Sequence, residues 1–171
     1  NAAGVFARDV VDHFDFKIVA NHDAPAWLRN AIFYQIFPDR FAKSGVARTF
    51  PEWAIPRKWS DIPALKQREV SQEFYGGDFR GVEEKLDHLS SLGINAIYFT
   101  PIFASKSNHR YDASSFEEAD PLLGGDKDLI ALRKSAAKSN IRVMSDLTTN
   151  HCGLGHPWIQ EALNNKNSPK R

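Results

Sequence analysis

The feature that most limits how this chain can fold is a set of three short apolar runs separated by amphipathic segments. The runs cover residues 31–37, 94–100 and 141–147, and the first two stop at a proline. The first run is nearly all apolar, which is typical of a strand that is buried on both faces, whereas the third run also contains Arg142, Ser145 and Asp146. We therefore predict three strands and expect the first two to be buried.

Two amphipathic segments lie between these runs and predict helices. Residues 80–92 form the first helix, with Asp78 as its N-cap and Gly93 as its stop signal. The second helix opens at Asp126 and ends near Ser139. Apolar side chains repeat on one face of each segment, as Val82, Leu86 and Leu89 in the first and as Leu129, Leu132 and Ala136 in the second.

Strands that alternate with helices predict right-handed crossovers and a parallel sheet. A doubly wound sheet and a (β/α)₈ barrel both begin in this way. The long connections at 42–75 and 101–125 follow strands, where barrel enzymes build their sites. No glycine-rich phosphate turn follows the first strand. We therefore expect an α/β fold of the partial TIM (β/α)₈ barrel type, with the first three strands and two to three helices.

The residues before the first run predict a separate segment. Residues 14–20 alternate apolar and polar side chains, which indicates a short strand, and a turn-like linker ends at Pro25. We expect residues 1–24 to end a preceding segment and residues 25–171 to belong to the barrel. A connection as long as 42–75 is expected to be functional or disordered.

Composition excludes several classes of protein. The 171 residues include 22 Lys and Arg against 21 Asp and Glu, so no basic surplus favours nucleic acid. One cysteine excludes an intramolecular disulfide framework, and no apolar run is long enough to span a membrane. The opening residues lack the apolar segment of a secretory signal, so we expect a cytoplasmic protein.

Polar residues gather where two of the predicted strands end. The third strand runs into Asp146, Asn150 and His151, and the loop after the second strand contains His109, Tyr111 and Asp112. In a barrel both groups lie on the carboxyl-terminal rim and face one pocket.

Four ordered motifs resemble the α-amylase superfamily, glycoside hydrolase family 13. They are YQIFPDRF (34–41), YGGDFRGVEEKLDHLSSLGINAIYFTPIF (75–103), SNHRYDASSFEEADPLLGG (107–125) and MSDLTTNHCG (144–153). The SNHRYD motif and the Cys-Gly after Asn-His are most similar to the branch of neopullulanase, cyclomaltodextrinase and maltogenic amylase. The resemblance implies a retaining hydrolase of α-glucosidic bonds in starch-derived glucans, with no required cofactor and no nucleic-acid or membrane partner.

The resemblance also implies roles for individual residues. His151 resembles the imidazole that bonds the hydroxyls of the cleaved sugar, Tyr111 the aromatic platform beneath it, and His109 a neighbouring sugar contact. Asp146, Asn150 and Asp112 resemble residues that support the site. These residue types suit a pyranose, which offers C–H groups to an aromatic face and hydroxyls to planar donors.

Taken without the resemblance, the same residues have simpler interpretations. Tyr111 also suits a packed or capping ring, Asp146 a helix N-cap, and Asn150 a turn. Trp53 and Trp59 suit either packing or the lining of a glucan groove. The spacing of His151, Cys152 and His156 fits no common zinc pattern.

The family's nucleophile and general acid match no residue here and are expected beyond Arg171. A retaining glycosidase needs two carboxylates about 5–5.5 Å apart. We therefore expect the 171-residue chain to be inactive by itself and to associate with itself through unpaired strand edges. A non-catalytic carbohydrate-binding module and a transglycosylase are the alternatives. Calcium is not expected, because residues 42–50 offer no carboxylate or amide beside Asp78.

Overall fold

The structure is a computed structural model that describes residues 20–21, 23–64 and 67–171. By its internal contacts the chain separates into Asn1–Asn30 and Ala31–Arg171. In the first unit the described part contains a 3₁₀ helix, η2 (Ala26–Asn30). Residues 14–19 of the strand predicted over 14–20 lie outside the described residues, and the predicted division at residue 24 stays a prediction.

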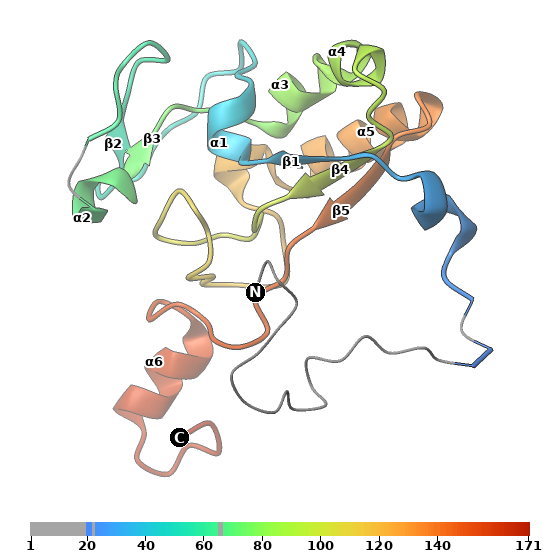
Figure 1. Cartoon of the computed structure of the whole chain (residues 1–171). Helices are drawn as coiled ribbons and strands as arrows, with labels where there is room; N and C mark the ends of the chain where they lie inside the picture. Colours follow the sequence, from blue (N-terminus) through green and yellow to red (C-terminus); the bar gives the residue numbers. More distant parts are fainter. Residues whose placement is uncertain (1–19, 22, 65–66) are drawn as a thin grey trace, which may run out of the picture. The chain divides into compact units, whose positions relative to one another are not determined.

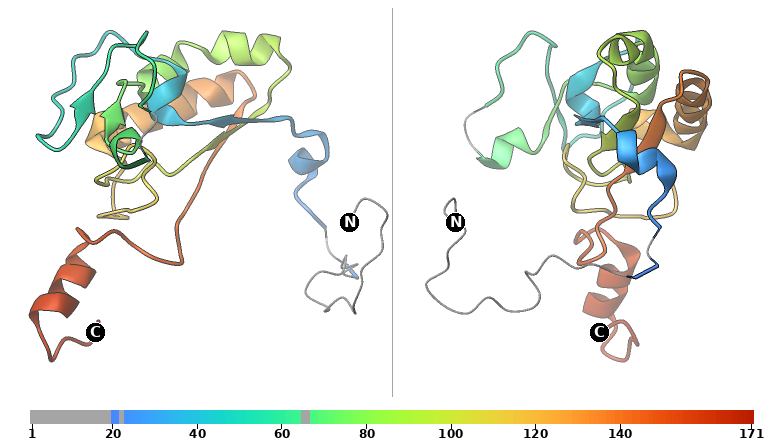
Figure 2. Two further views of the ribbon diagram at one scale, coloured as in Figure 1. Left: turned by 60° about the vertical axis from the view of Figure 1, so that its left-hand side comes forward. Right: turned by 45° about the vertical axis from the view of Figure 1, so that its right-hand side comes forward.

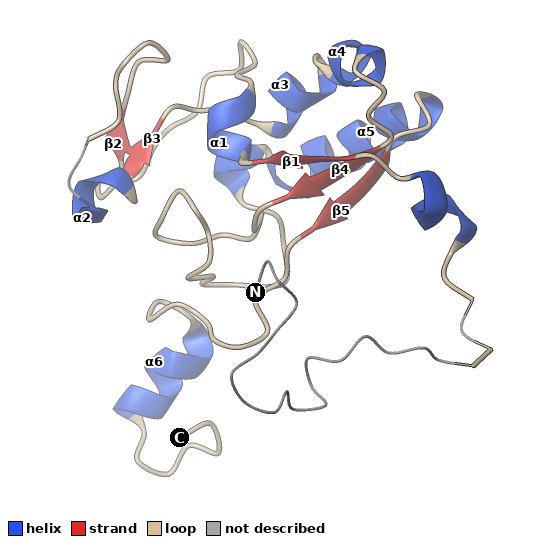
Figure 3. Cartoon of the chain, viewed as in Figure 1, coloured by secondary structure: helices blue, strands red, loops and turns tan. Residues whose placement is uncertain are grey.

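The second unit is built on a parallel sheet, as the sequence predicts. Strands β1 (Phe33–Ile36), β4 (Ala96–Phe99) and β5 (Arg142–Ser145) pair in the order β1-β4-β5 (Figures 1 and 3). In register, Ile36 lies beside Phe99, and Phe99 beside Ser145. The three strands therefore end together, which places the loops that follow them at one edge of the sheet.

Helices cover one face of this sheet (Figure 2). They are α3 (Phe79–Glu83), α4 (Leu86–Ser91) and α5 (Gly125–Lys138). The buried core joins Ile36, Ile97 and Phe99 of the strands to side chains of these helices, chiefly Val82, Leu89, Leu132 and Ala136.

The opposite face of the sheet is open, which corrects one prediction. Phe33, Gln35, Tyr98 and Met144 project from this face and line a hollow of about 250 Å³. Because side chains alternate along a strand, only every second residue of β1 reaches the helix-covered core. The expectation that β1 is buried on both faces is wrong for this chain, since Phe33 is 41% exposed and Gln35 is also exposed.

The helix predicted over 80–92 is divided in two. Asp78 is its N-cap as predicted, with Oδ1 accepting from the Gly81 N–H at 2.8 Å. Gly93 follows the second part with a left-handed φ of 77°. Lys85 lies between the two helices with φ −105° and ψ 7°, outside α-helical geometry. The apolar spacing survives this break, which explains why periodicity did not reveal it.

The long connections contain short elements that sequence periodicity did not predict. Helices α1 (Pro38–Phe41) and α2 (Gln67–Val70) and the parallel pair β2 (Ile55–Pro56) and β3 (Glu73–Phe74) lie between β1 and α3. Elements of two to four residues are too short to show a period. The second connection includes η3 (Pro121–Leu123), and α6 (Pro157–Asn164) follows β5.

Candidate functional site

The loop after β4 meets the end of β5 at a hydrogen bond between two predicted site residues. The Tyr111 hydroxyl donates to Asp146 Oδ2 at 2.9 Å. Burial and the Asp146 carboxylate raise the pKa of Tyr111 above its ordinary value. The structure thus brings together two side chains that lie 35 residues apart in the sequence.

Tyr98 joins this pair, and sequence reasoning missed it. Its hydrogen bond with Asp146, together with burial, raises the pKa of its hydroxyl. Tyr98 lies on the open face of β4. The alternation of side chains along a strand could have identified Tyr98. Residues 97 and 99 point into the core, so residue 98 points to the other face of the sheet.

Ser107 organises the loop that carries His109, Tyr111 and Asp112. Its hydroxyl donates to Asp112 Oδ1, contacts His109 Nδ1 at 3.1 Å, and accepts from the Arg110 N–H at 3.1 Å. The Tyr111 N–H donates to His109 Nδ1, also at 3.1 Å. His109 and Tyr111 therefore form one unit, with ring centroids 6.0 Å apart.

His151 and Asn150 are placed less firmly than Tyr111. Both are exposed, and their side chains contact each other at 3.3 Å. Among the described residues, no hydrogen bond joins either of them to Tyr111 or Asp146. The structure therefore assembles the tyrosine–aspartate part of the predicted site but does not bring His151 into it.

Gly153 fixes the loop after β5 against the loop after β4. Its N–H donates to the Ala113 carbonyl at 2.8 Å. A Cβ at this position would lie 2.1 Å from the Asp112 carbonyl oxygen, so no residue with a side chain fits without a shift of backbone. The glycine that follows Asn-His-Cys thus has a packing role between the two loops.

The alternative interpretation of Asp146 as a helix N-cap is wrong. The next helix, α6, begins eleven residues further on at Pro157, and its N-cap is His156, whose Nδ1 accepts from the Trp158 N–H at 3.2 Å. Tyr111 as a whole residue is 39% exposed and so does not belong to the packed core.

Trp53 and Trp59 have different environments. The Trp53 ring packs edge-on against Phe74 with centroids 5.5 Å apart. Trp59 remains 46% exposed and borders a hollow of about 180 Å³ with Arg40 and Tyr75. The packing interpretation therefore holds for Trp53, whereas Trp59 is available to a ligand.

Two fully buried carboxylates, Asp39 and Glu73, were not predicted from the sequence. Asp39 accepts from the N–H groups of Tyr75 and Gly76 at 3.0 and 2.9 Å, and burial raises its pKa. Glu73 pairs with Arg57 and accepts from the Ala64 N–H. Because both bind backbone amides, they hold the connection between β1 and α3 in place.

Asp78 is occupied by partners other than a metal. It accepts from the Ser44 hydroxyl at 2.5 Å and from Arg48 at 3.0 Å. Arg48 also pairs with Asp128 at 3.2 Å, and Asp128 with Arg80 at 3.1 Å. The described residues include no group of three or more histidine, cysteine or acidic side chains placed to hold a metal.

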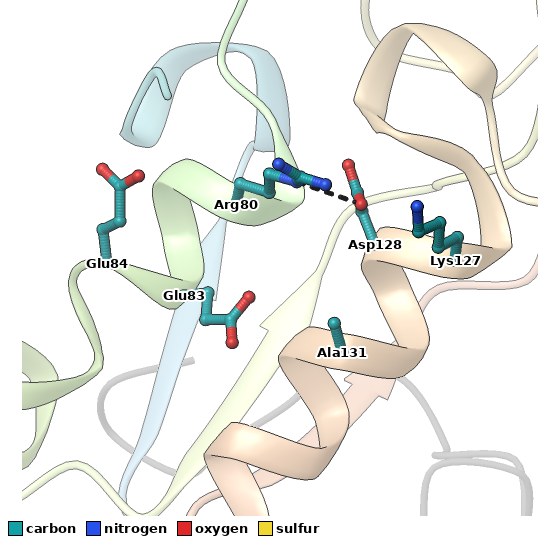
Figure 4. Close-up of a pocket in the computed structure, with 6 residues that line it drawn as sticks. All are labelled: Arg80, Glu83, Glu84, Lys127, Asp128 and Ala131. Atoms are coloured by element: carbon teal, nitrogen blue, oxygen red, sulfur yellow. Dashed lines mark hydrogen bonds and ion pairs between the residues drawn. The ribbon is translucent and has the colours of Figure 1, made fainter. Parts of the chain in front are cut away.

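A charged groove of about 430 Å³ lies between α3 and α5, and Figure 4 shows the side chains that line it. Its acidic and basic side chains oppose one another, and it includes none of the predicted site residues. The residues that line it are Arg80, Glu83, Glu84, Lys127, Asp128 and Ala131. Arg80 and Asp128 form an ion pair at 3.1 Å, and Glu83 accepts from the Ser135 hydroxyl at 2.6 Å.

Comparison with known proteins identifies the family. Residues 35–171 match the family model described as alpha amylase, catalytic domain. The chain belongs to the α-amylase family. It is 41% identical over 146 residues to a cyclomaltodextrinase of Bacillus sp., covering 85% of the chain and 25% of that protein. It is 37% identical over 158 residues to the intracellular maltogenic amylase of Bacillus subtilis strain 168, covering 90% of the chain and 26% of that protein.

A solved structure of a related sequence has a similar fold. The ligand-free cyclic α-maltosyl-(1→6)-maltose hydrolase of Arthrobacter globiformis superposes with a TM-score of 0.75 at 38% identity, over 86% of this chain and 32% of that one. The resemblance predicted from the four motifs and the partial-barrel fold class are both confirmed. This α-amylase-family chain spans about a quarter of the length of the curated relatives that it matches. No helix in the described ranges has the length and apolar character needed to cross a bilayer.

Proposed function

We propose that this chain forms part of an enzyme that hydrolyses α-glucosidic bonds in maltodextrins, cyclodextrins or pullulan. The observation that carries the proposal is the Tyr111–Asp146 hydrogen bond, which holds a half-exposed aromatic ring where two loops meet after parallel strands. Such a ring face packs against the C–H groups of a pyranose. The matched proteins are named as hydrolases or amylases of α-glucans, which supports this substrate class.

The proposed roles follow from the contacts of each side chain. Tyr111 serves as the platform of the sugar. The Nδ1 atom of His109 already contacts Ser107 and the Tyr111 N–H, so its Nε2 is the nitrogen that faces a sugar hydroxyl. Asp146 and Asp112 hold Tyr111 and Ser107.

His151 and Asn150 complete the site in this proposal. His151 is exposed and contacts Asn150, so it is free to turn toward a bound sugar. Asn150 supports it from the same loop. This proposal requires the loop after β5 to order around the substrate, with Gly153 as its fixed end.

The bond-breaking step requires groups that this chain does not provide. A retaining mechanism uses a nucleophilic carboxylate and a carboxylic acid on opposite sides of the scissile bond. The buried Asp39 and Glu73 are bound to backbone amides and arginines and do not suit either role. We propose that other segments of a longer protein supply both groups, and that the 171-residue chain alone does not hydrolyse α-glucans.

The proposed enzyme needs no cofactor and holds no calcium at Asp78, because Arg48 already neutralises that carboxylate. Its proposed location is the cytoplasm, as the word intracellular in the name of one relative suggests. Its proposed partner is the glucan, with neither nucleic acid nor membrane.

Binding and activity test this proposal separately. Isotope-labelled chain is titrated with maltoheptaose and followed by nuclear magnetic resonance (NMR). We expect shifts at Tyr111 and His109 in the wild type. The His109 shift is expected to be lost in Tyr111→Ala and retained in Trp158→Ala, an exposed aromatic control. Absence of binding in the folded wild type contradicts the proposal. Steady release of reducing sugar by the pure chain contradicts the assignment of catalysis to other segments.

The longer protein that contains this chain distinguishes the alternatives. Tyr111→Ala and His151→Ala are expected to lower kcat/KM by about ten- to a thousandfold with little change in folding. Wild-type kinetics in both variants contradict the assigned roles. Binding without any turnover indicates a binding module, and transfer of glucosyl units to sugar acceptors indicates a transglycosylase.

A further inference from the structure

Arg110 lies between the two predicted sugar contacts His109 and Tyr111 but has the opposite exposure. Its side chain is 0% exposed, whereas the side chain of His109 and the whole of Tyr111 are both 39% exposed. A fully buried arginine in a surface loop is uncommon, because its charge must be paired and its donors must find acceptors. The contacts of the Arg110 guanidinium therefore indicate which groups hold the loop in its conformation.

The guanidinium of Arg110 spans two acceptors of the same connection, one two residues before it and one ten residues after it. Its Nε donates to Asp120 Oδ2 at 2.7 Å, and its Nη1 donates to the Asn108 carbonyl at 2.8 Å. The guanidinium also lies 5.7 Å from the centroid of the Phe74 ring. Within the described residues its Nη2 has no partner.

Both acceptors are themselves held in place. Asp120 is buried, and its Oδ1 accepts from the Leu122 N–H at 2.8 Å at the start of η3. Asn108 donates through Nδ2 to the Glu73 carbonyl at 2.8 Å, and its N–H donates to the Ser71 carbonyl at 2.8 Å. Arg110 therefore connects the loop to parts of the fold on either side of it.

The backbone conformation of Arg110 sets the directions in which the side chains of residues 109 and 111 point. Its φ is +60°, in the left-handed region that residues with a side chain seldom adopt. The surrounding contacts hold the chain there, and this turn sends residue 110 inward while residues 109 and 111 face outward. The Arg110 N–H also donates to Ser107 Oγ at 3.1 Å, so this bond and the buried guanidinium together hold the backbone conformation.

We infer that Arg110 is a positioning residue of the glucan site, which sets the direction of the Tyr111 ring and of His109 from inside the fold. The inference rests on the proposed function, since it assigns a role within the same site. Lysine cannot replace it, because one ammonium nitrogen does not span the Asp120 carboxylate and the Asn108 carbonyl in the fixed geometry of a guanidinium.

The experiment compares Arg110→Lys and Asp120→Asn with Arg133→Lys, a change of the same kind at an exposed position of α5. Circular dichroism first establishes that each variant is folded. Two readouts follow: NMR of ¹³C-labelled tyrosine across a pH series, with Tyr111→Phe to assign the signal, and affinity for maltoheptaose.

In the wild type, burial and the hydrogen bond to Asp146 raise the pKa of Tyr111 above its ordinary value. In both test variants the pKa of Tyr111 is expected to return toward its ordinary value. The pKa of Tyr98, which stays on the strand beside Asp146, is expected to remain raised. Affinity for maltoheptaose is expected to fall by about ten- to a hundredfold, as for a small misplacement of a binding group. Arg133→Lys is expected to change neither readout.

Folded Arg110→Lys and Asp120→Asn proteins with an unchanged Tyr111 signal overturn the inference. If Arg110→Lys does not fold, Asp120→Asn decides. If neither folds, Arg110 holds the whole fold and the inference of a local positioning role is wrong. Failure of the wild type to bind maltoheptaose contradicts the proposed function instead, and the tyrosine signal still decides whether Arg110 positions Tyr111.

Discussion

Tyr111 and Asp146 are joined by a 2.9 Å hydrogen bond that links the loop after β4 to the end of β5. Tyr98 approaches the same carboxylate from β4. Two phenol groups therefore share one acceptor at the edge of the sheet where the strands end. This arrangement has a consequence for stability at high pH.

We expect the free energy of unfolding to fall as the pH rises above about 10. The pKa values of Tyr98 and Tyr111 are raised above 10.0 in the folded chain, so the protonated hydroxyls stabilise the fold below the unfolded pKa. This contribution is lost as the pH rises through the folded pKa values. Urea unfolding between about pH 8 and pH 11 measures the slope. Tyr98→Phe and Tyr111→Phe are each expected to reduce it, and an unchanged slope in the double variant contradicts the shared-carboxylate arrangement.

Gly153→Ala is expected to destabilise the chain by about 2 kcal/mol or more, because the new methyl group meets the Asp112 carbonyl and forces the two loops apart. Gly155→Ala is the matched control. A Cβ at Gly155 has no neighbour closer than 3.5 Å, and a change within about 0.5 kcal/mol is expected. Chemical denaturation measures both. Equal effects at the two glycines contradict the contact between the loops.

Trp53→Ala and Trp59→Ala are expected to separate packing from binding. Loss of the Trp53 ring uncovers Phe74 and lowers stability by about 1–3 kcal/mol, with affinity for glucans unchanged. Loss of the exposed Trp59 ring changes stability little but weakens binding of longer maltodextrins by about three- to tenfold. Denaturation and calorimetric titration measure the two effects. Full affinity in Trp59→Ala excludes it from the glucan groove.

The chain is expected to associate with itself at micromolar concentration through the unpaired edges of the outer strands β1 and β5, beside the open face of the sheet. Phe33 and Met144 are 41% and 45% exposed on this face, where they line a shallow hollow. Phe33→Lys and Met144→Lys are expected to shift sedimentation toward the monomer. Ile130→Lys, at an equally exposed apolar position on α5, is the control. A compact wild-type monomer with a sharp unfolding transition contradicts this prediction.

The sequence by itself determined the order of the three strands, the helix starts near Asp78 and Asp126, and the family. Apolar runs and capping residues are local signals, and a parallel sheet follows from the alternation of strands and helices. The same local signals placed His109, Tyr111, Asp112 and Asp146 after the ends of strands. For these features, residues close in sequence contain the information.

Only the tertiary structure decided which of these side chains meet. The Tyr111–Asp146 bond, the approach of Gly153 to Asp112, and the burial of Arg110 against Asp120 depend on how separate loops pack, which no periodicity encodes. The break at Lys85 and the open face beside Phe33 and Met144 were likewise decided by the tertiary structure. Burial and pairing are properties of the assembled chain, because a side chain is covered or satisfied only by residues that folding brings to it.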